Sequence, residues 1–198
     1  MGRLHPDANS RTSGDTAHHR LTSSAEAMMT EPQPAPFAHV LSAQNSSTSG
    51  YVAALAELET GHKSGHWVWY IFPQLAGLGR SGMAQKFAIS GHIEAHAYLA
   101  HPVLGPRLLA AQQVVLNQLS PPTSRSLIGL MGGQLDAQKL VSSCTLFGHV
   151  AQGLESDGDA AAVVDRARLV ATACRQILAI AARQGLPPCS FTLDAIAE

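Results

Sequence analysis

From Phe37 onward, hydrophobic residues recur at the three- and four-residue spacing that is typical of α-helices. The clearest case is the stripe Leu104, Leu108, Ala111, Val115 and Leu119, which predicts one long helix with a single buried face. The periodic segments, several of them only one or two turns long, lie at residues 37–41, 51–58, 66–71, 82–89, 92–99, 102–119, 124–130, 134–150 and 163–181. Together they predict about six to eight short and medium helices.

Residues that begin or end helices separate these segments. Gly61 and Gly185 stand where a helix is expected to stop, and Pro121-Pro122 interrupts the chain after the long predicted helix. Pro102 is expected to begin that helix, because its missing N–H costs nothing there, and Ser81 is expected to cap the helix at residues 82–89. No segment alternates hydrophobic and polar residues between turn signals. We therefore predict an all-α fold, a compact single-domain bundle without strands.

The first part of the chain lacks the helical pattern. Residues 1–36 are rich in Ser, Thr, Pro, Gly and His and contain few large hydrophobic side chains. Such a segment buries too little apolar surface to offset the entropy that it would lose on ordering. We therefore predict a disordered N-terminal arm at residues 1–36 and a helical domain at residues 37–198.

Composition narrows the possible partners. Hydrophobic residues make up 45% of the chain and charged residues only 14%, against a usual share of about a quarter. The chain can therefore form a core, but its weakly charged surface could be covered by a protein partner or by self-association. The net charge of −1 argues against a nucleic-acid partner bound through its phosphates and against a polybasic patch for a membrane.

The cysteines indicate a reducing compartment. Cys144, Cys174 and Cys189 are odd in number, form no C-x-x-C pair and lie in or near apolar runs. Residues 1–30 contain no apolar run of the kind found in a signal peptide. The most apolar stretch, residues 160–182, contains four charged residues, which argues against a membrane span. We therefore expect a cytoplasmic protein without a membrane partner.

Aromatic residues are concentrated at residues 63–74. Trp67, Trp69, Tyr70 and Phe72 are four of the ten aromatic residues in the chain. On a helix, His66 would share a face with Trp69, while Trp67 would lie on another face. One face is therefore expected in the core, and the other could line a cleft.

This segment resembles the first of three motifs of the uncharacterised "domain of unknown function 1810" family. The motifs are HWVWYIFPQLAGLGRS at residues 66–81, YLAHPVLGPRL at 98–108 and KLVSSCTLF at 139–147. The resemblance covers roughly residues 37–150 and is specific, because three motifs occur in the right order. It implies a compact all-helical protein without an established activity; some members carry a calpastatin label.

The chain departs from the family pattern in two places. Gly65 stands where the family usually has Ser directly before the His. After Gly153 the chain lacks the family's aromatic-rich ending, and only Thr192-Leu193 is similar to it. The resemblance therefore implies no role for the C-terminal segment.

The three motifs carry groups that could bind a small anionic ligand. Lysine and arginine supply cationic donors, histidine can act as an acid or base near neutral pH, and an indole can stack on a planar ring. The alternative is that the aromatic residues are core and that the cations pair with Asp136, Glu94 or helix C-termini. The candidate ligand-binding residues are Lys63, His66, Trp67, Trp69, Gln74, Arg80, His101, Arg107, Lys139 and Ser142.

Two histidine pairs have the spacing of metal ligands on a helix. His62 and His66, and also His92 and His96, are four residues apart. Neither pair contains the glutamate of an H-E-x-x-H motif. We therefore expect no metal site.

Two further patterns are incomplete. Residues 142–145 contain hydroxyl and thiol groups near His149, but no G-x-S-x-G turn surrounds them. Gly77, Gly79 and Gly82 spell G-x-G-x-x-G without a preceding strand, which favours a tight loop over a dinucleotide site. No catalytic residue is assigned, and no cofactor is expected.

Two classes of function remain open. One is a small-molecule-binding protein or enzyme with an anionic ligand in a cleft of the three motifs, and the other is a non-enzymatic protein-interaction module. A cavity touched by His66, Arg80 and Lys139 would favour the first class. An exposed apolar patch on the order of several hundred Å² would favour the second.

Overall fold

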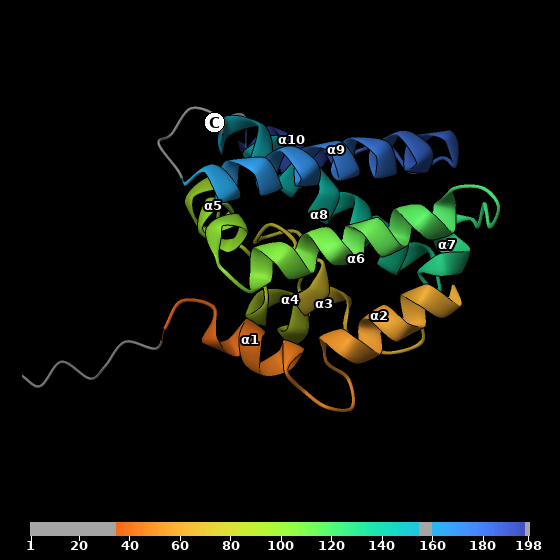
Figure 1. Ribbon diagram of the computed structural model, residues 1–198, viewed down its shortest axis with the longest axis horizontal. Helices are drawn as coiled ribbons and strands as arrows, with labels where there is room; N and C mark the ends of the chain where they lie inside the picture. The colour runs from red at the N-terminus through yellow and green to blue at the C-terminus, as the bar shows by residue number, and fades with distance from the viewer. Residues whose placement is uncertain (1–34, 155–159, 197–198) are drawn as a thin grey trace, which may run out of the picture. The chain divides into compact units, whose positions relative to one another are not determined.

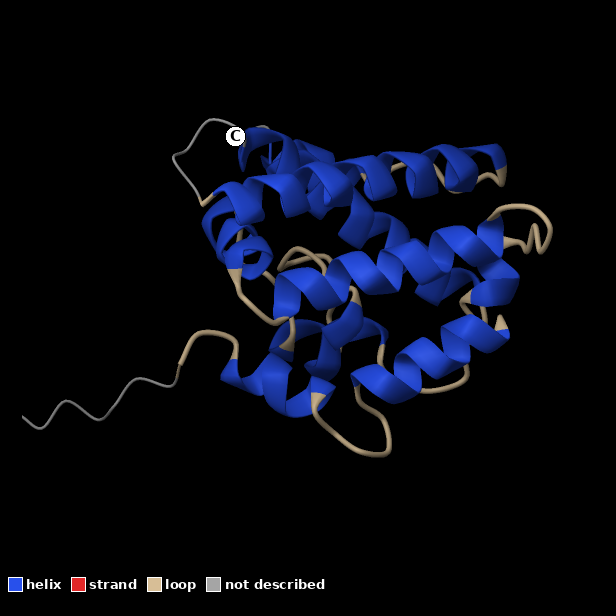
Figure 2. Ribbon diagram, in the orientation of Figure 1, coloured by secondary structure: helices blue, strands red, loops and turns tan. Residues whose placement is uncertain are grey.

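A computed structural model describes residues 35–154 and 160–196. The arm predicted at residues 1–36 therefore lies outside the described residues, except for its last two positions. The described part of the chain is helical and forms no strand, only an isolated bridge between Leu75 and Ile89 (Figure 2). The predicted all-α class is confirmed.

Ten helices occur within the described ranges, more than the six to eight predicted. Nine of the ten overlap the nine periodic segments given by the sequence, including the single-turn helices at residues 68–71 and 127–130. The last helix has no such segment, because only Thr192 of its residues is buried and no hydrophobic stripe marks it. The helices are α1 (Ala38–Gln44), α2 (Tyr51–Thr60), α3 (Val68–Ile71), α4 (Gly82–Lys86), α5 (His92–Ala100), α6 (Leu104–Leu119), α7 (Leu127–Leu130), α8 (Gln134–Gly153), α9 (Ala161–Arg183) and α10 (Ser190–Ile196).

The long helices form the centre of the core, with α9 packed against both α8 and α6 (Figure 1). The stripe predicted on α6 is buried along its whole length, which confirms that prediction. Gly148 of α8 lets α9 approach closely, because a Cβ at this position would lie 3.0 Å from the Cβ of Cys174. No helix in the described part of the chain is both long and apolar enough to span a membrane.

The aromatic segment joins the shorter helices to this core. Trp67 and Phe72 are fully buried, Trp69 is half-buried and His66 is exposed. The segment is tied to α2, because the indole Nε1 of Trp67 donates a hydrogen bond to Oε2 of Glu57 (2.8 Å). The helix within this aromatic segment, α3, also packs against α1, α6 and α8.

Two predicted helix starts have different outcomes. Ser81 caps α4 as predicted, since its Oγ accepts a hydrogen bond from the Ala84 N–H (3.1 Å). The prediction that Pro102 begins α6 is wrong: the helix begins at Leu104. The reason is that Nδ1 of His101 accepts hydrogen bonds from the N–H groups of Val103 (3.1 Å) and Leu104 (3.2 Å), so Pro102 lies in the turn before the helix.

Candidate functional site

A pocket of about 490 Å³ opens between the first half of α8 and two loops. One loop, residues 74–79, follows the aromatic segment, and the other, residues 185–191, follows α9 and enters α10. The lining residues are Gln74, Leu78, Gly79, Gln134, Leu135, Gln138, Lys139, Val141, Ser142, Gly185, Leu186, Pro187, Pro188, Cys189, Ser190 and Phe191.

One wall of this pocket is polar and belongs to α8. Gln134 and Gln138 are four residues apart, and Lys139 and Ser142 follow at helical spacing, so a single helix supplies amides, a cation and a hydroxyl. Ser142 is buried, and its hydroxyl lies 3.1 Å from that of Thr192 on α10. Among the lining residues that the structure describes, Lys139 is the only one with a charged side chain.

The opposite wall is apolar and comes from residues 185–191. Leu186, Pro187 and Phe191 supply most of it. The ring of Phe191 lies against Gly77, whose φ of +89° and missing side chain allow the contact: a Cβ there would be 3.1 Å from the ring. Leu135, 73% exposed, and Phe191, 40% exposed, make the rim apolar.

The charge of Lys139 belongs to a cluster beside the pocket. The carboxylate of Asp136 lies between two lysines: Oδ1 is 2.6 Å from Nζ of Lys139, and Oδ2 is 2.5 Å from Nζ of Lys63. Burial raises the pKa of Asp136, but the hydrogen bonds and charges of the two lysines outweigh burial and lower it overall. With the carboxylate ionised, the cluster has a net charge of +1.

Each of these lysines also lies over a tryptophan. Nζ of Lys63 is 5.0 Å from the ring centroid of Trp67, and Nζ of Lys139 is 4.4 Å from that of Trp69. Nε1 of Trp69 is buried and has no hydrogen-bond partner in the described part of the chain. The first and third motifs therefore meet where Lys139 lies over Trp69. Both lysines pair with Asp136, which is one of the alternatives that the sequence left open for the cations.

The structure separates the candidate residues into groups. It brings Gln74, Lys139 and Ser142 together in the pocket and places Lys63 and Trp69 beside Lys139. Trp67 is in the core, and His66 and Arg80 are exposed and outside the pocket.

The two candidates of the middle motif also lie outside the pocket. His101 accepts the two backbone hydrogen bonds at the start of α6, and burial lowers its pKa, both of which favour the neutral imidazole. Arg107 donates to the side chains of Gln44 (3.1 Å) and Asn45 (3.0 Å) and lies over Tyr51. The pocket therefore uses the first and third motifs.

The C-terminal segment, to which the sequence assigned no role, supplies seven of the sixteen lining residues. Its attachment depends on the third motif: Thr145 accepts a hydrogen bond from the Cys189 N–H (3.2 Å), and Ser142 pairs with Thr192. Gly185 and the prolines that follow it predict a loop at this point of the chain. No local sequence pattern predicts that this loop packs against α8.

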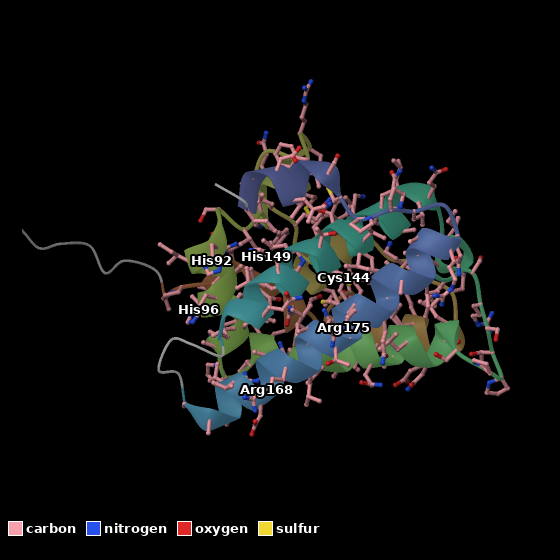
Figure 3. The ribbon with its side chains drawn as sticks, turned by 90° about the horizontal axis from the view of Figure 1, so that it is seen from above. His92, His96, Cys144, His149, Arg168 and Arg175 are labelled. Atoms are coloured by element: carbon pink, nitrogen blue, oxygen red, sulfur yellow. The ribbon has the colours of Figure 1, made fainter. Side chains whose placement is uncertain are left out.

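The hydroxyl and thiol groups at residues 142–145 are not arranged around a base. Cys144 lies on α8 (Figure 3) and is fully buried. A hydrogen bond with Cys174, together with burial, raises the pKa of its thiol. His149 is exposed, whereas the hydroxyl and thiol groups at residues 142–145 are buried. Thr145 donates to the carbonyl oxygen of Val141 (2.8 Å), which is an ordinary contact for threonine in a helix.

The two histidine pairs lie on different parts of the fold. His92 and His96 are on α5, at the end of the bundle where His149 of α8 also lies (Figure 3). Nδ1 of His62 is 3.3 Å from the carbonyl oxygen of Gly129. Among the described residues, no group of three or more His, Cys, Asp or Glu side chains is placed to hold a metal ion.

The fold and the pocket define an all-α protein with α9 packed on two long helices and a ligand-sized pocket on the first half of α8. The family model described as "Protein of unknown function (DUF1810)" matches residues 35–166, and the chain belongs to this family. The family expected from the three motifs is confirmed. The matched residues end before the loop at 185–191, so seven of the sixteen residues that line the pocket lie beyond them.

A solved structure supports the same assignment. The chain is similar to the conserved hypothetical protein Rv1873 from Mycobacterium tuberculosis, with a TM-score of 0.60 and 32% sequence identity. The alignment covers 84% of this chain and 99% of that chain. The comparison with curated proteins found no match.

Proposed function

We propose that this protein binds a small organic anion in the pocket beside Lys139. The observation that carries the proposal is the position of Lys139: a single cation on the polar wall of a pocket whose opposite wall is apolar. A volume of about 490 Å³ lies within the usual range for small-molecule sites. A ligand with an anionic group at α8 and an apolar body against Leu186 and Phe191 would use both walls.

The proposal is for binding rather than for a reaction. The described side chains that line the pocket include no histidine, aspartate or glutamate, the groups that most often transfer protons near neutral pH. A ligand-binding role needs only the cation, the amides of Gln134 and Gln138 and the apolar wall. This proposal keeps the small-molecule function that the sequence suggested, but its site does not include His66 and Arg80.

A thermal-shift screen against metabolites and nucleotides tests the proposal. A ligand that binds the folded state raises the melting temperature by mass action. The shift should be lost in Lys139→Met and kept in Lys86→Met, which removes the same charge outside the pocket. His66→Ala should respond like the wild type. The proposal fails if no compound shifts the wild type, or if Lys139→Met responds equally.

One observation favours a second candidate, a protein-interaction module. Leu135 and Phe191 are exposed on the rim of the pocket, where an apolar side chain of a partner could enter. If this is the function, the protein should self-associate or bind a partner, and Leu135→Ser should abolish the interaction. Sedimentation velocity over a range of concentrations measures self-association directly.

A further inference from the structure

The two lysines that contact Asp136 are held very differently. Lys63 is 6% exposed, and its Nζ also donates to the carbonyl oxygen of Gly65 (2.6 Å). Its backbone is fixed as well, because its N–H donates to the carbonyl oxygen of Leu130 (2.8 Å). Lys139 is 23% exposed, lines the pocket and has a flexible four-carbon stem. Lys139 can therefore turn toward the pocket, whereas Lys63 cannot.

The lysines also use different oxygens of the same carboxylate. Lys139 contacts Oδ1 of Asp136, and Lys63 contacts Oδ2. If Lys139 turns to a ligand, Asp136 keeps a charged partner. Without Lys63, the same movement would leave a half-buried carboxylate without a charged partner, which is unfavourable.

We infer that Lys63 is a positioning residue that frees Lys139 to bind the carboxylate of a small apolar monoacid. This inference rests on the proposed binding function and adds the class of ligand and the way its charge is recognised. Lys63 does not line the pocket and acts through Asp136.

The charge balance favours a monoanion. The cluster of Lys63, Asp136 and Lys139 carries a net charge of +1, and only Lys139 faces the pocket. A phosphate dianion is usually bound by several cations or a cluster of N–H donors. A carboxylate needs one cation and can also accept hydrogen bonds from the amides of Gln134 and Gln138, while its apolar body contacts the wall from residues 185–191.

The small number of lysines makes a direct test possible. The chain contains three, Lys63, Lys86 and Lys139, so ¹³C labelling at the lysine ε carbon gives three NMR reporters. On titration with benzoate, the Lys139 signal should move most, the Lys63 signal should move less because Lys63 shares Asp136 with Lys139, and the Lys86 signal, outside the pocket, should stay. Benzoate should bind about tenfold more tightly than neutral benzamide, the scale of one charge-assisted hydrogen bond. Inorganic phosphate should bind more weakly than benzoate.

Variants separate positioning from a merely structural role. The ratio of benzoate to benzamide affinity should fall to about one in Lys139→Met and should decrease several-fold in Lys63→Met. It should stay unchanged in Lys63→Arg. It should rise in Asp136→Asn, because the carboxylate no longer competes with the ligand for Lys139. Benzamide affinity reports the shape of the pocket and should change by less than about twofold. If the role of Lys63 is only structural, Lys63→Met lowers both affinities together and leaves their ratio unchanged.

Each outcome has a distinct meaning. Circular dichroism shows whether Lys63→Met folds. If it does not fold, the lysine NMR signals of the wild type and the affinities of Asp136→Asn still test the inference. A ratio of benzoate to benzamide affinity that does not rise in Asp136→Asn overturns it. Equal binding of benzoate and benzamide to the wild type overturns the ligand class but leaves a small-molecule pocket standing. If neither probe perturbs any residue of the pocket at millimolar concentration, the proposed function fails as well.

Discussion

The indole Nε1 of Trp67 donates a hydrogen bond of 2.8 Å to Oε2 of Glu57, which joins the aromatic segment to α2. The same oxygen accepts the backbone N–H groups of Ser64 (2.7 Å) and Gly65 (2.8 Å). One carboxylate therefore fixes the loop that carries Lys63. A Cβ at Gly65 would lie 2.7 Å from Oε1 of Glu57, so a side chain at this position would require the carboxylate to shift.

Glu57→Ala should destabilise the protein. The change removes the acceptor of three hydrogen bonds and leaves the buried indole N–H unpaired, at a cost of about 1–3 kcal/mol. Glu59→Ala is the matched control, because Glu59 is exposed on the same helix. Urea unfolding measures both variants, and equal losses of stability would contradict the role of Glu57.

Stability should fall in acid partly through Asp136. Its pKa in the folded protein lies below the unfolded value of about 4, because Lys139 and Lys63 outweigh burial. The stabilisation is therefore complete above the unfolded pKa and is lost as the pH falls through the folded pKa. The difference in unfolding free energy between wild type and Asp136→Asn should be largest near neutral pH and shrink below about pH 4. Urea titrations across this range test the prediction, and a constant difference would refute it.

Ser142→Ala should loosen α10 and with it one wall of the pocket. The change leaves the buried hydroxyl of Thr192 without its partner on α8, at a cost of about 1–2 kcal/mol. The double variant Ser142→Ala/Thr192→Val removes both hydroxyls and should recover part of that loss. Amide hydrogen exchange over residues 190–196 follows the helix directly. Unchanged exchange in Ser142→Ala would show that the hydroxyl pair does not hold α10.

Gly148→Ala should destabilise the contact between α8 and α9. The new Cβ would lie 3.0 Å from the Cβ of Cys174, and the cost of this overpacking, about 1–3 kcal/mol, should exceed the gain of up to about 1 kcal/mol that Ala brings to a helix. Gly82→Ala in α4 is the control, because nothing lies within 4 Å of a Cβ there. It should be neutral or stabilising by up to about 1 kcal/mol. Thermal unfolding of both variants checks the contrast.

The three cysteines should differ in reactivity. Cys144 and Cys174 are buried in the core, and the pKa of Cys144 is raised, so both thiols should be inert in the folded protein. Cys189 is half-buried and lines the pocket. A thiol reagent such as Ellman's reagent should modify Cys189 first and all three cysteines only in denaturant. Rapid modification of Cys144 in native conditions would show that the core opens.

Part of the candidate site is predictable from the sequence. The residue types of the third motif placed Lys139 and Ser142 among the candidates, and the pairing of lysines with Asp136 was one of the expected alternatives. Asp136 and Lys139 are three residues apart on one helix, so that contact is local. By contrast, His66 of the first motif is a candidate that lies outside the pocket, because Trp67 packs into the core and His66 is exposed.

The all-α class, the long amphipathic helices and the family can be predicted from the sequence alone, because helical periodicity and short motifs depend on residues that are close together in the chain. The position of the pocket depends on contacts between segments that are far apart in the chain. Its two walls meet through contacts such as Thr145 with Cys189 and Ser142 with Thr192, which join residues 44 and 50 positions apart. Such contacts leave no periodic signal, and in α10 a single buried threonine takes the place of a hydrophobic stripe.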